Sequence, residues 1–296
     1  MKKCLYNLVF ATLILMNTTV VYASNEVYYI NNNGIEISEE EYNNLLTLGF
    51  SDKYIAQMEE DEFLNNKDLE GTLLSKETKY IKMTTVMRNG IRNTIIEEIT
   101  YEEAMILQSQ SEHNRGPAGN YYDGLVGTSV FEMSTNITGI GNLYMRFMNN
   151  VEWLVIPSER YYDVIGIGME GNKVQFATNI IFKQEWVTSG GVHQYDDVCA
   201  PKYDSNGGLV IFKLPEANIT SLDIVLYFNV KKQNNVGTIT SLYAVGDYAH
   251  AICNVSPNTL LSNISISAAS GIMIDSPYST CYQSTSEATA SFIGTW

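Results

Sequence analysis

The feature that most constrains the fold is a run of strict alternation at 222–230. Every second side chain in this run is apolar, which places the apolar positions on one face of a β-strand. The opposite face is mixed, as is typical of an antiparallel sheet with one face on a core and the other in water. The apolar face consists of Leu222, Ile224, Leu226, Phe228 and Val230.

Turn-forming residues divide the chain after residue 124 into about ten short candidate strands. The clearest turn signals lie at 138–141, 170–172, 205–208 and 233–235. Short strands at this spacing favour two packed sheets, and the pattern therefore predicts a mainly antiparallel β-sandwich over residues 125–296.

The preceding part of the chain predicts hairpins and short helices. Asn-Gly pairs at 33–34 and 89–90 suit tight hairpin turns. Ser38 and Thr100 are each followed three residues later by a glutamate, the spacing of a helix capping box, and Ser51 is a further helix start. We expect a small, acidic N-terminal region of hairpins and short helices.

The periodic pattern stops at 111–124, where turn formers gather. We interpret this segment as a linker between an acidic N-terminal region, 24–110, and the β-sandwich domain, 125–296. The predicted fold class is α+β.

Residues 1–23 have the pattern of a secretion signal peptide. Lys2 and Lys3 precede an apolar run, and Val21 and Ala23 place small residues before the predicted cleavage site. The apolar run is shorter than the roughly 20 residues that a spanning helix needs. We expect a secreted, extracellular protein without a transmembrane segment in the mature chain.

The formal net charge is −15 at pH 7. The nearest approach to a basic cluster is the pair Lys231-Lys232. Polyanion binding depends on clustered cations, so we expect no nucleic-acid partner. No residue pattern indicates a cofactor.

Three cysteines follow the predicted cleavage site: Cys199, Cys253 and Cys281. They allow at most one internal disulfide, with three possible pairings, and leave one thiol over. The predicted β-rich domain is long enough for a hydrophobic core to stabilise it without several disulfides.

The segment 189–208 is the most suggestive for chemistry. A thiol, an imidazole and carboxylates occur close together, and such groups can form a nucleophile, its base and an orienting acid. The same oxygen ligands could hold calcium, although the spacing is that of a β-turn and departs from a regular calcium loop. The residues concerned are His193, Asp196, Asp197, Cys199, Asp204 and Asn206.

The histidines do not predict a zinc site. His113, His193 and His250 lack zinc-ligand spacing. His250 lies in strand-like sequence, where a hydrogen bond to a neighbour is the expected role. We assign no catalytic, cofactor-binding or metal-binding residue.

Aromatic side chains gather at or near predicted loops. Such side chains stack on sugars and bind peptides, and they also cover sheet faces. The set comprises Tyr121, Tyr122, Trp153, Tyr161, Tyr162, Trp186, Tyr195 and Trp296.

Three segments carry a resemblance. The pattern from Tyr29 to Ile55, including Ser38-Glu39-Glu40-Glu41-Tyr42 and Leu48-Gly49-Phe50, resembles the mature start of many uncharacterised exported proteins of low-GC Gram-positive bacteria. Segments Ser158–Gly168 and Tyr248–Val255 are similar to parts of the β-rich half of such proteins. The resemblance implies an exported bacterial protein and carries no activity.

The leading hypothesis is a secreted, non-enzymatic protein that binds a surface, glycan or protein ligand through its β-sandwich. One alternative is a secreted hydrolase that uses the 189–208 loop. Another is a pore-forming protein, because Ser262–Thr295 is rich in Ser and Thr and could form an amphipathic hairpin. The N-terminal region could also be a pro-segment or a chaperone-like cap for the second region.

Overall fold

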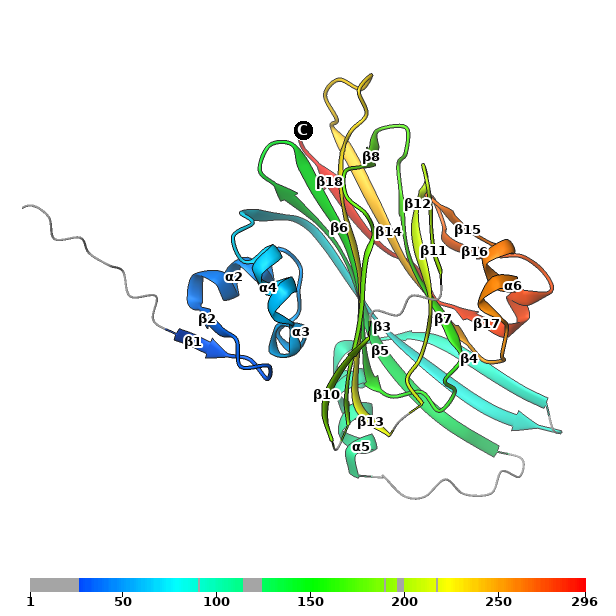
Figure 1. The fold of residues 1–296 in the computed structure, drawn as a ribbon. Helices are drawn as coiled ribbons and strands as arrows, with labels where there is room; N and C mark the ends of the chain where they lie inside the picture. The colour runs from blue at the N-terminus through cyan, green and yellow to red at the C-terminus, as the bar shows by residue number, and fades with distance from the viewer. Residues whose placement is uncertain (1–26, 90, 114–123, 189, 196–199, 217) are drawn as a thin grey trace, which may run out of the picture.

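A computed structural model describes residues 27–89, 91–113, 124–188, 190–195, 200–216 and 218–296. Within these ranges the chain is mostly antiparallel β-sheet, as predicted (Figure 1). Two large sheets pack face to face, and a smaller layer covers part of each outer face.

The first sheet has eight strands in the order β10-β9-β13-β6-β5-β3-β4, with β8 also paired to β13. All of its strand pairs are antiparallel. Its strands are β3 (Gly71–Arg88), β4 (Ile91–Ile99), β5 (Gly124–Ile140), β6 (Tyr144–Val155), β8 (Val174–Phe176), β9 (Ile181–Thr188), β10 (Gly191–Tyr195) and β13 (Ile219–Lys232).

The second sheet has six strands in the order β11-β12-β7-β14-β17, with β18 also paired to β14. Its strands are β7 (Tyr162–Met169), β11 (Ala200–Asp204), β12 (Gly207–Lys213), β14 (Ser241–Ala251), β17 (Tyr282–Ser284) and β18 (Ala288–Ile293).

Short helices and two-stranded sheets complete the described elements. They are β1 (Val27–Ile30), β2 (Glu36–Ser38), α2 (Glu39–Thr47), α3 (Asp52–Gln57), α4 (Glu60–Asn66), α5 (Tyr101–His113), α6 (Pro257–Ser262), β15 (Ile264–Ser267), β16 (Gly271–Ile274) and the 3-10 helix η1 (Tyr278–Cys281).

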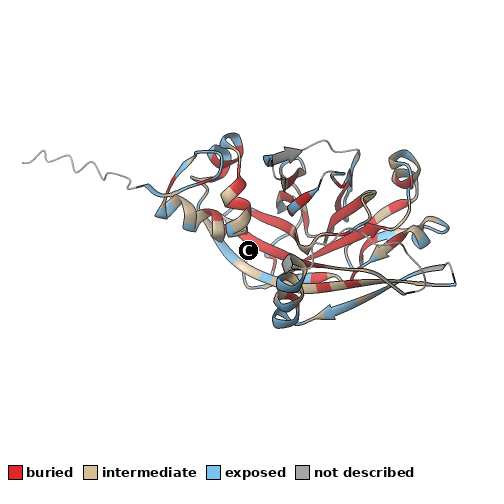
Figure 2. Ribbon diagram, turned by 90° about the horizontal axis from the view of Figure 1, so that it is seen from below, coloured by how far each residue is buried: buried red, intermediate tan, exposed pale blue. Residues whose placement is uncertain are grey.

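The main core lies between the two sheets, where aromatic side chains of both sheets meet. Phe131 of the first sheet contacts Trp153 and Tyr248, and Phe182 contacts Phe212 of the second. Figure 2 shows buried residues concentrated along the central strands, with exposed residues on loops and outward helix faces. This burial supplies the main hydrophobic stabilisation.

Strand β13 confirms the predicted alternation on its inner face. Leu222, Leu226, Phe228 and Val230 are fully buried, and Ile224 is nearly so. The expectation of a solvated outer face is wrong, because Asp223, Val225 and Tyr227 are also buried. Residues that precede the sheet in the chain cover this face.

We name residues 27–69 the N-terminal cap. In Figure 1 its helices α2, α3 and α4 lie beside the first sheet. Ser38 accepts a hydrogen bond from the Glu41 amide while the Glu41 carboxylate accepts one from Ser38, which is the predicted capping box. Its apolar side chains pack on Met148, Val225 and Tyr227 of the sheet.

The hairpin β3–β4 differs from the predicted division of the chain. The predicted N-terminal region includes residues 71–99, yet β3 pairs along its length with β5. The first sheet therefore contains strands from both sides of 111–124. Of that predicted linker, residues 111–113 belong to α5, and 114–123 lie outside the described residues.

We name residues 256–274 the C-terminal cap. It comprises α6, β15 and β16, which pack through apolar side chains on the outer face of the second sheet. Two glycines of β7 permit this contact, since a Cβ atom at Gly168 would lie 2.2 Å from the Ser267 carbonyl oxygen and one at Gly166 would lie 2.9 Å from Ile272.

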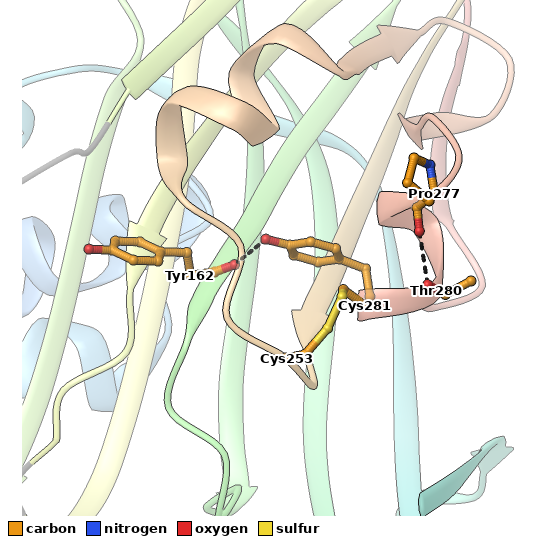
Figure 3. Close-up of a disulfide and its surroundings, with 6 residues drawn as sticks. Tyr162, Cys253, Pro277, Thr280 and Cys281 are labelled. Atoms are coloured by element: carbon orange, nitrogen blue, oxygen red, sulfur yellow. Dashed lines mark hydrogen bonds between the residues drawn. A yellow bond between two sulfur atoms is a disulfide. The ribbon is translucent and has the colours of Figure 1, made fainter.

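A disulfide joins Cys253, just after β14, to Cys281 at the end of η1. This is one of the three pairings that the sequence left open, and Cys199 lies outside the described residues. Beside the disulfide, the Tyr282 hydroxyl donates to the Tyr162 carbonyl at 2.8 Å (Figure 3). The disulfide and this bond attach the segment after the C-terminal cap to the second sheet.

Candidate functional site

A groove of about 630 Å³ lies where the start of β3, the turn between β5 and β6, and the end of β18 meet. The end of β18 and the turn between β5 and β6 lie at the end of the molecule that carries the label C in Figure 1. Its volume is in the range of ligand pockets. The groove is lined by Glu70, Gly71, Thr72, Leu74, Gly139, Gly141, Asn142, Tyr144, Met145, Phe292, Thr295 and Trp296.

Three aromatic side chains of the groove are at least partly exposed. Tyr144 is 40% exposed, while Phe292 and Trp296 are half-buried against the main core. Phe292 lies close over the backbone, because a Cβ atom at Gly294 would be 2.7 Å from its ring.

The main chain and a lysine hold Trp296 in place. Its amide donates to the Ile239 carbonyl at 3.0 Å and its carbonyl accepts from the Ile239 amide at 2.9 Å. The Lys232 ammonium lies 5.7 Å from the centre of the indole ring, within the range of a cation–π contact. An indole held this way can present its face to a ligand at little cost in side-chain entropy.

Polar side chains surround the aromatic ones. Glu70, Thr72, Asn142 and Thr295 line the groove and are exposed. Together they offer a carboxylate, an amide and two hydroxyls, which can both donate and accept hydrogen bonds. A ligand with an apolar face and a hydroxyl-rich edge matches this arrangement.

The aromatic residues predicted near loops occupy different environments in the structure. Trp296 lines the groove, whereas Trp153 is buried in the main core. Tyr161 and Tyr162 pack beside the C-terminal cap, and Trp186 packs against the main core. Of the remaining members, Tyr121 and Tyr122 lie outside the described residues, and the side chain of Tyr195 is not described.

Three groove residues, Tyr144, Phe292 and Glu70, are not among the candidates predicted from the sequence. Tyr144 lies three residues after the predicted turn at 138–141, so proximity to a turn could have indicated it. Glu70 lies about 70 residues earlier in the chain than Asn142, and only the pairing of β3 with β5 brings them together.

The 189–208 loop hypothesis stays a prediction. His193 lies in β10, where its backbone is opposite Trp186, while Asp196, Asp197 and Cys199 lie outside the described residues. Asp204 and Asn206 form a turn, because the Asn206 amide donates to the Asp204 carboxylate at 2.7 Å. This is the β-turn that the sequence analysis preferred over a calcium loop at this position.

His250 has the role expected of a strand histidine. Its Nδ1 lies 2.9 Å from Asp163 Oδ2, and Asp163 also accepts from the Ala251 amide and the Tyr248 hydroxyl. The ring borders a pocket of about 80 Å³. Asp163 lies in β7 and His250 in β14, and the two side chains meet because these strands are paired. Each residue belongs to a segment that carries the sequence resemblance.

The described residues contain neither a metal-binding cluster nor a membrane-spanning helix. No three His, Cys, Asp or Glu side chains there are placed to hold a metal ion. Nor does that part of the chain contain a helix with the length and apolar character that a membrane crossing requires.

No model of a known protein family matches the chain, and no curated protein matches it significantly. Among solved structures, the collagen-binding domain of Erysipelothrix rhusiopathiae surface protein RspB is similar at 7% identity, with a TM-score of 0.25, over 76% of this chain and 84% of that one.

A second match is a structure of manganese lipoxygenase of Gaeumannomyces graminis with part of zonadhesin of Komagataella pastoris. Its identity is 8% and its TM-score 0.23, over 77% of this chain and 88% of that one. At these TM-scores neither match bears on function. The chain is thus characterised by its own geometry: two packed antiparallel sheets, a cap on each and an aromatic groove at one end.

Proposed function

We propose that the protein is an exported, non-enzymatic binding protein whose groove takes a neutral glycan. One observation carries the proposal: Tyr144, Phe292 and Trp296 converge with exposed carboxylate, amide and hydroxyl groups in one groove. Sugar rings have an apolar face and a rim of hydroxyls, so they complement a site with both kinds of group.

Charge favours a neutral ligand over an anionic one. The groove contains the carboxylate of Glu70, and the formal net charge of the chain is −15. Lys232 lies against the indole ring and is not among the residues that line the groove. A polyanionic glycan would meet net repulsion during its approach.

Export is supported by two features of the chain. Residues 1–23 have the pattern of a cleavable secretion signal. The Cys253–Cys281 disulfide suits an oxidising compartment outside the cytoplasm. An extracellular location would bring the groove into contact with cell-surface glycans, in agreement with the resemblance to exported bacterial proteins.

The test is calorimetric titration of the protein with neutral oligosaccharides from bacterial, plant and animal surfaces. We expect at least one to bind, and Trp296→Ala to weaken that binding about five- to thirtyfold, since a stacked aromatic contact is worth roughly 1–2 kcal/mol. Tyr101→Ala is the matched control, because Tyr101 is 54% exposed at the start of α5, away from the groove.

Two results would contradict the proposal. One is the absence of binding to every neutral glycan tested while a peptide or anionic glycan binds. The other is glycan binding that Trp296→Ala leaves unchanged, which would move the site away from the groove. Circular dichroism of each variant checks that the sheets remain intact.

A further inference from the structure

The contact between the N-terminal cap and the first sheet contains a row of carboxylic acids. Glu185 of β9 is opposite Asp223 of β13, Asp223 is opposite Glu152 of β6, and Glu152 is opposite Glu132 of β5. Residues directly opposite in an antiparallel sheet share a face, with Cβ atoms about 5 Å apart. Four acids therefore lie side by side across four neighbouring strands.

The N-terminal cap covers one end of this row. Glu185 is fully buried and Asp223 is 3% exposed. From α4 the cap adds another buried acid, Glu62, which accepts hydrogen bonds from the hydroxyls of Tyr54 at 2.6 Å and Tyr227 at 3.2 Å. Three carboxyls are thus enclosed in one contact.

Two lysines form ion pairs at this contact. The Lys53 ammonium of α3 lies 3.0 Å from Glu152 and 3.4 Å from Asp223, and Lys183 of β9 lies 3.6 Å from Glu59. The charged and titratable groups that face the row come from α3 (Lys53, Tyr54), α4 with its preceding residue (Glu59, Asp61, Glu62), β3 (Lys76, Tyr80), β5 (Glu132), β6 (Arg146, Glu152), β9 (Lys183, Glu185) and β13 (Asp223, Tyr227).

Burial raises the pKa values of four acids at this contact, Glu62, Glu132, Glu185 and Asp223. Burial raises the pKa of Asp223 to about 6, although Lys53 opposes the shift. Burial, together with the neighbouring Glu62 and Asp223, raises the pKa of Glu185 well above its usual range. The pKa values of Glu62 and Glu132 are also raised, chiefly by burial.

We propose that the N-terminal cap is a pH-sensitive cover of the first sheet, held in place while the enclosed carboxyls are protonated and loosened when they ionise. This inference is independent of the proposed glycan site. When the cap leaves, Asp223, Glu185 and Glu62 gain water and their mutual repulsion falls.

The direction of the pH dependence follows from the linkage between proton binding and docking of the cap. A carboxyl with a raised pKa in the docked state binds more protons there than in the undocked state. Its stabilising contribution is therefore complete at low pH and is lost as the pH rises through the docked-state value. For Asp223 the main loss falls between about pH 4 and pH 6.

Hydrogen exchange followed by mass spectrometry of the full chain tests the proposal. Protection of residues 50–66, corrected for the intrinsic exchange rate and divided by that of β5 and β6, should fall about tenfold or more between pH 4.5 and pH 7.5. In Asp223→Asn and Glu185→Gln, which cannot ionise there, the fall should be markedly smaller.

Glu216→Gln is the matched control, because Glu216 is an exposed acid next to Lys213 and lies outside the contact. It should leave the pH profile unchanged. A protection ratio that stays constant between pH 4.5 and pH 7.5 would overturn the proposal. So would a fall in Asp223→Asn and Glu185→Gln as large as that in the unchanged protein. A parallel loss of protection in β5 and β6 would show global unfolding and would also overturn it.

Discussion

The two caps cover equivalent outer faces of the two sheets with different chemistry. The C-terminal cap buries Leu260, Ile264, Ile266 and Ile272 on an apolar face of the second sheet. The N-terminal cap buries apolar side chains as well, but encloses Glu62, Glu185 and Asp223 among them.

The buried acids beneath the two caps differ in number and in their hydrogen-bond partners. The buried acid beneath the C-terminal cap is Asp247, which accepts from the backbone amides of Ile272 at 2.8 Å and Tyr248 at 2.7 Å. Burial raises its pKa to about 7, about a unit above that of Asp223. One acid held by two amides contrasts with a row of acids that oppose each other. The comparison indicates that the C-terminal cap meets a single buried acid with one of its own backbone amides, whereas the N-terminal cap encloses several acids that repel one another when ionised.

The largest expected effect is in the C-terminal cap. Leu260→Ala removes a fully buried side chain from α6, and should lower the free energy of unfolding by about 2–5 kcal/mol through lost burial and a residual cavity. Chemical denaturation measures it at two pH values. A similar loss at pH 5 and pH 8 is expected, and a strong pH dependence would contradict the apolar character of this contact.

A smaller, pH-dependent effect is expected from Lys53→Met. The substitution removes the cation that neutralises Glu152 and Asp223 while keeping the apolar part of the side chain. We expect a loss of about 1–2 kcal/mol at pH 8, reduced because Lys53 is partly exposed, and a smaller loss at pH 4.5. Denaturation curves at both pH values check this, and an equal loss at both would show that charge is not the cause.

The smallest expected effect is that of Tyr227→Phe. It deletes one of two hydroxyls that donate to Glu62 and leaves the Arg146 contact with the ring in place. A loss of about 1 kcal/mol is expected near neutral pH. Tyr42→Phe is a control, because its hydroxyl bonds to Asp52 at the surface. If Tyr227→Phe and Tyr42→Phe lower the free energy of unfolding equally, the enclosed hydrogen bond stabilises the protein no more than the surface one.

Local patterns predicted much of the β architecture. The alternation at 222–230 and the capping pair Ser38–Glu41 depend on neighbours in sequence, so they could be predicted before the structure. The buried outer face of β13 could not, because its cover comes from residues about 170 positions earlier. A mixed sequence on a strand looks the same whether water or an acidic cap lies over it.

The groove was harder to predict than the fold. Trp296 could be identified as a candidate by residue type alone, but Trp153 and Trp186 met the same criterion and pack against the core. What distinguishes them is the convergence of β3, the β5–β6 turn and β18, which depends on the packing of the two sheets. Residue type indicates what a side chain can do, and long-range pairing decides whether it meets a ligand.

One glycine lies between the cap and the groove. Gly71 lines the groove, and a Cβ atom there would lie 2.8 Å from Leu48 of the cap and 3.1 Å from Thr138 of β5. A single stretch of backbone, 70–72, is therefore both the tether of the cap and a wall of the groove. If a molecule binds the groove more tightly in one position of the cap than in another, its binding must shift the equilibrium between those cap positions. The ratio of the two affinities sets the size of that shift, because coupling free energies between two sites are reciprocal.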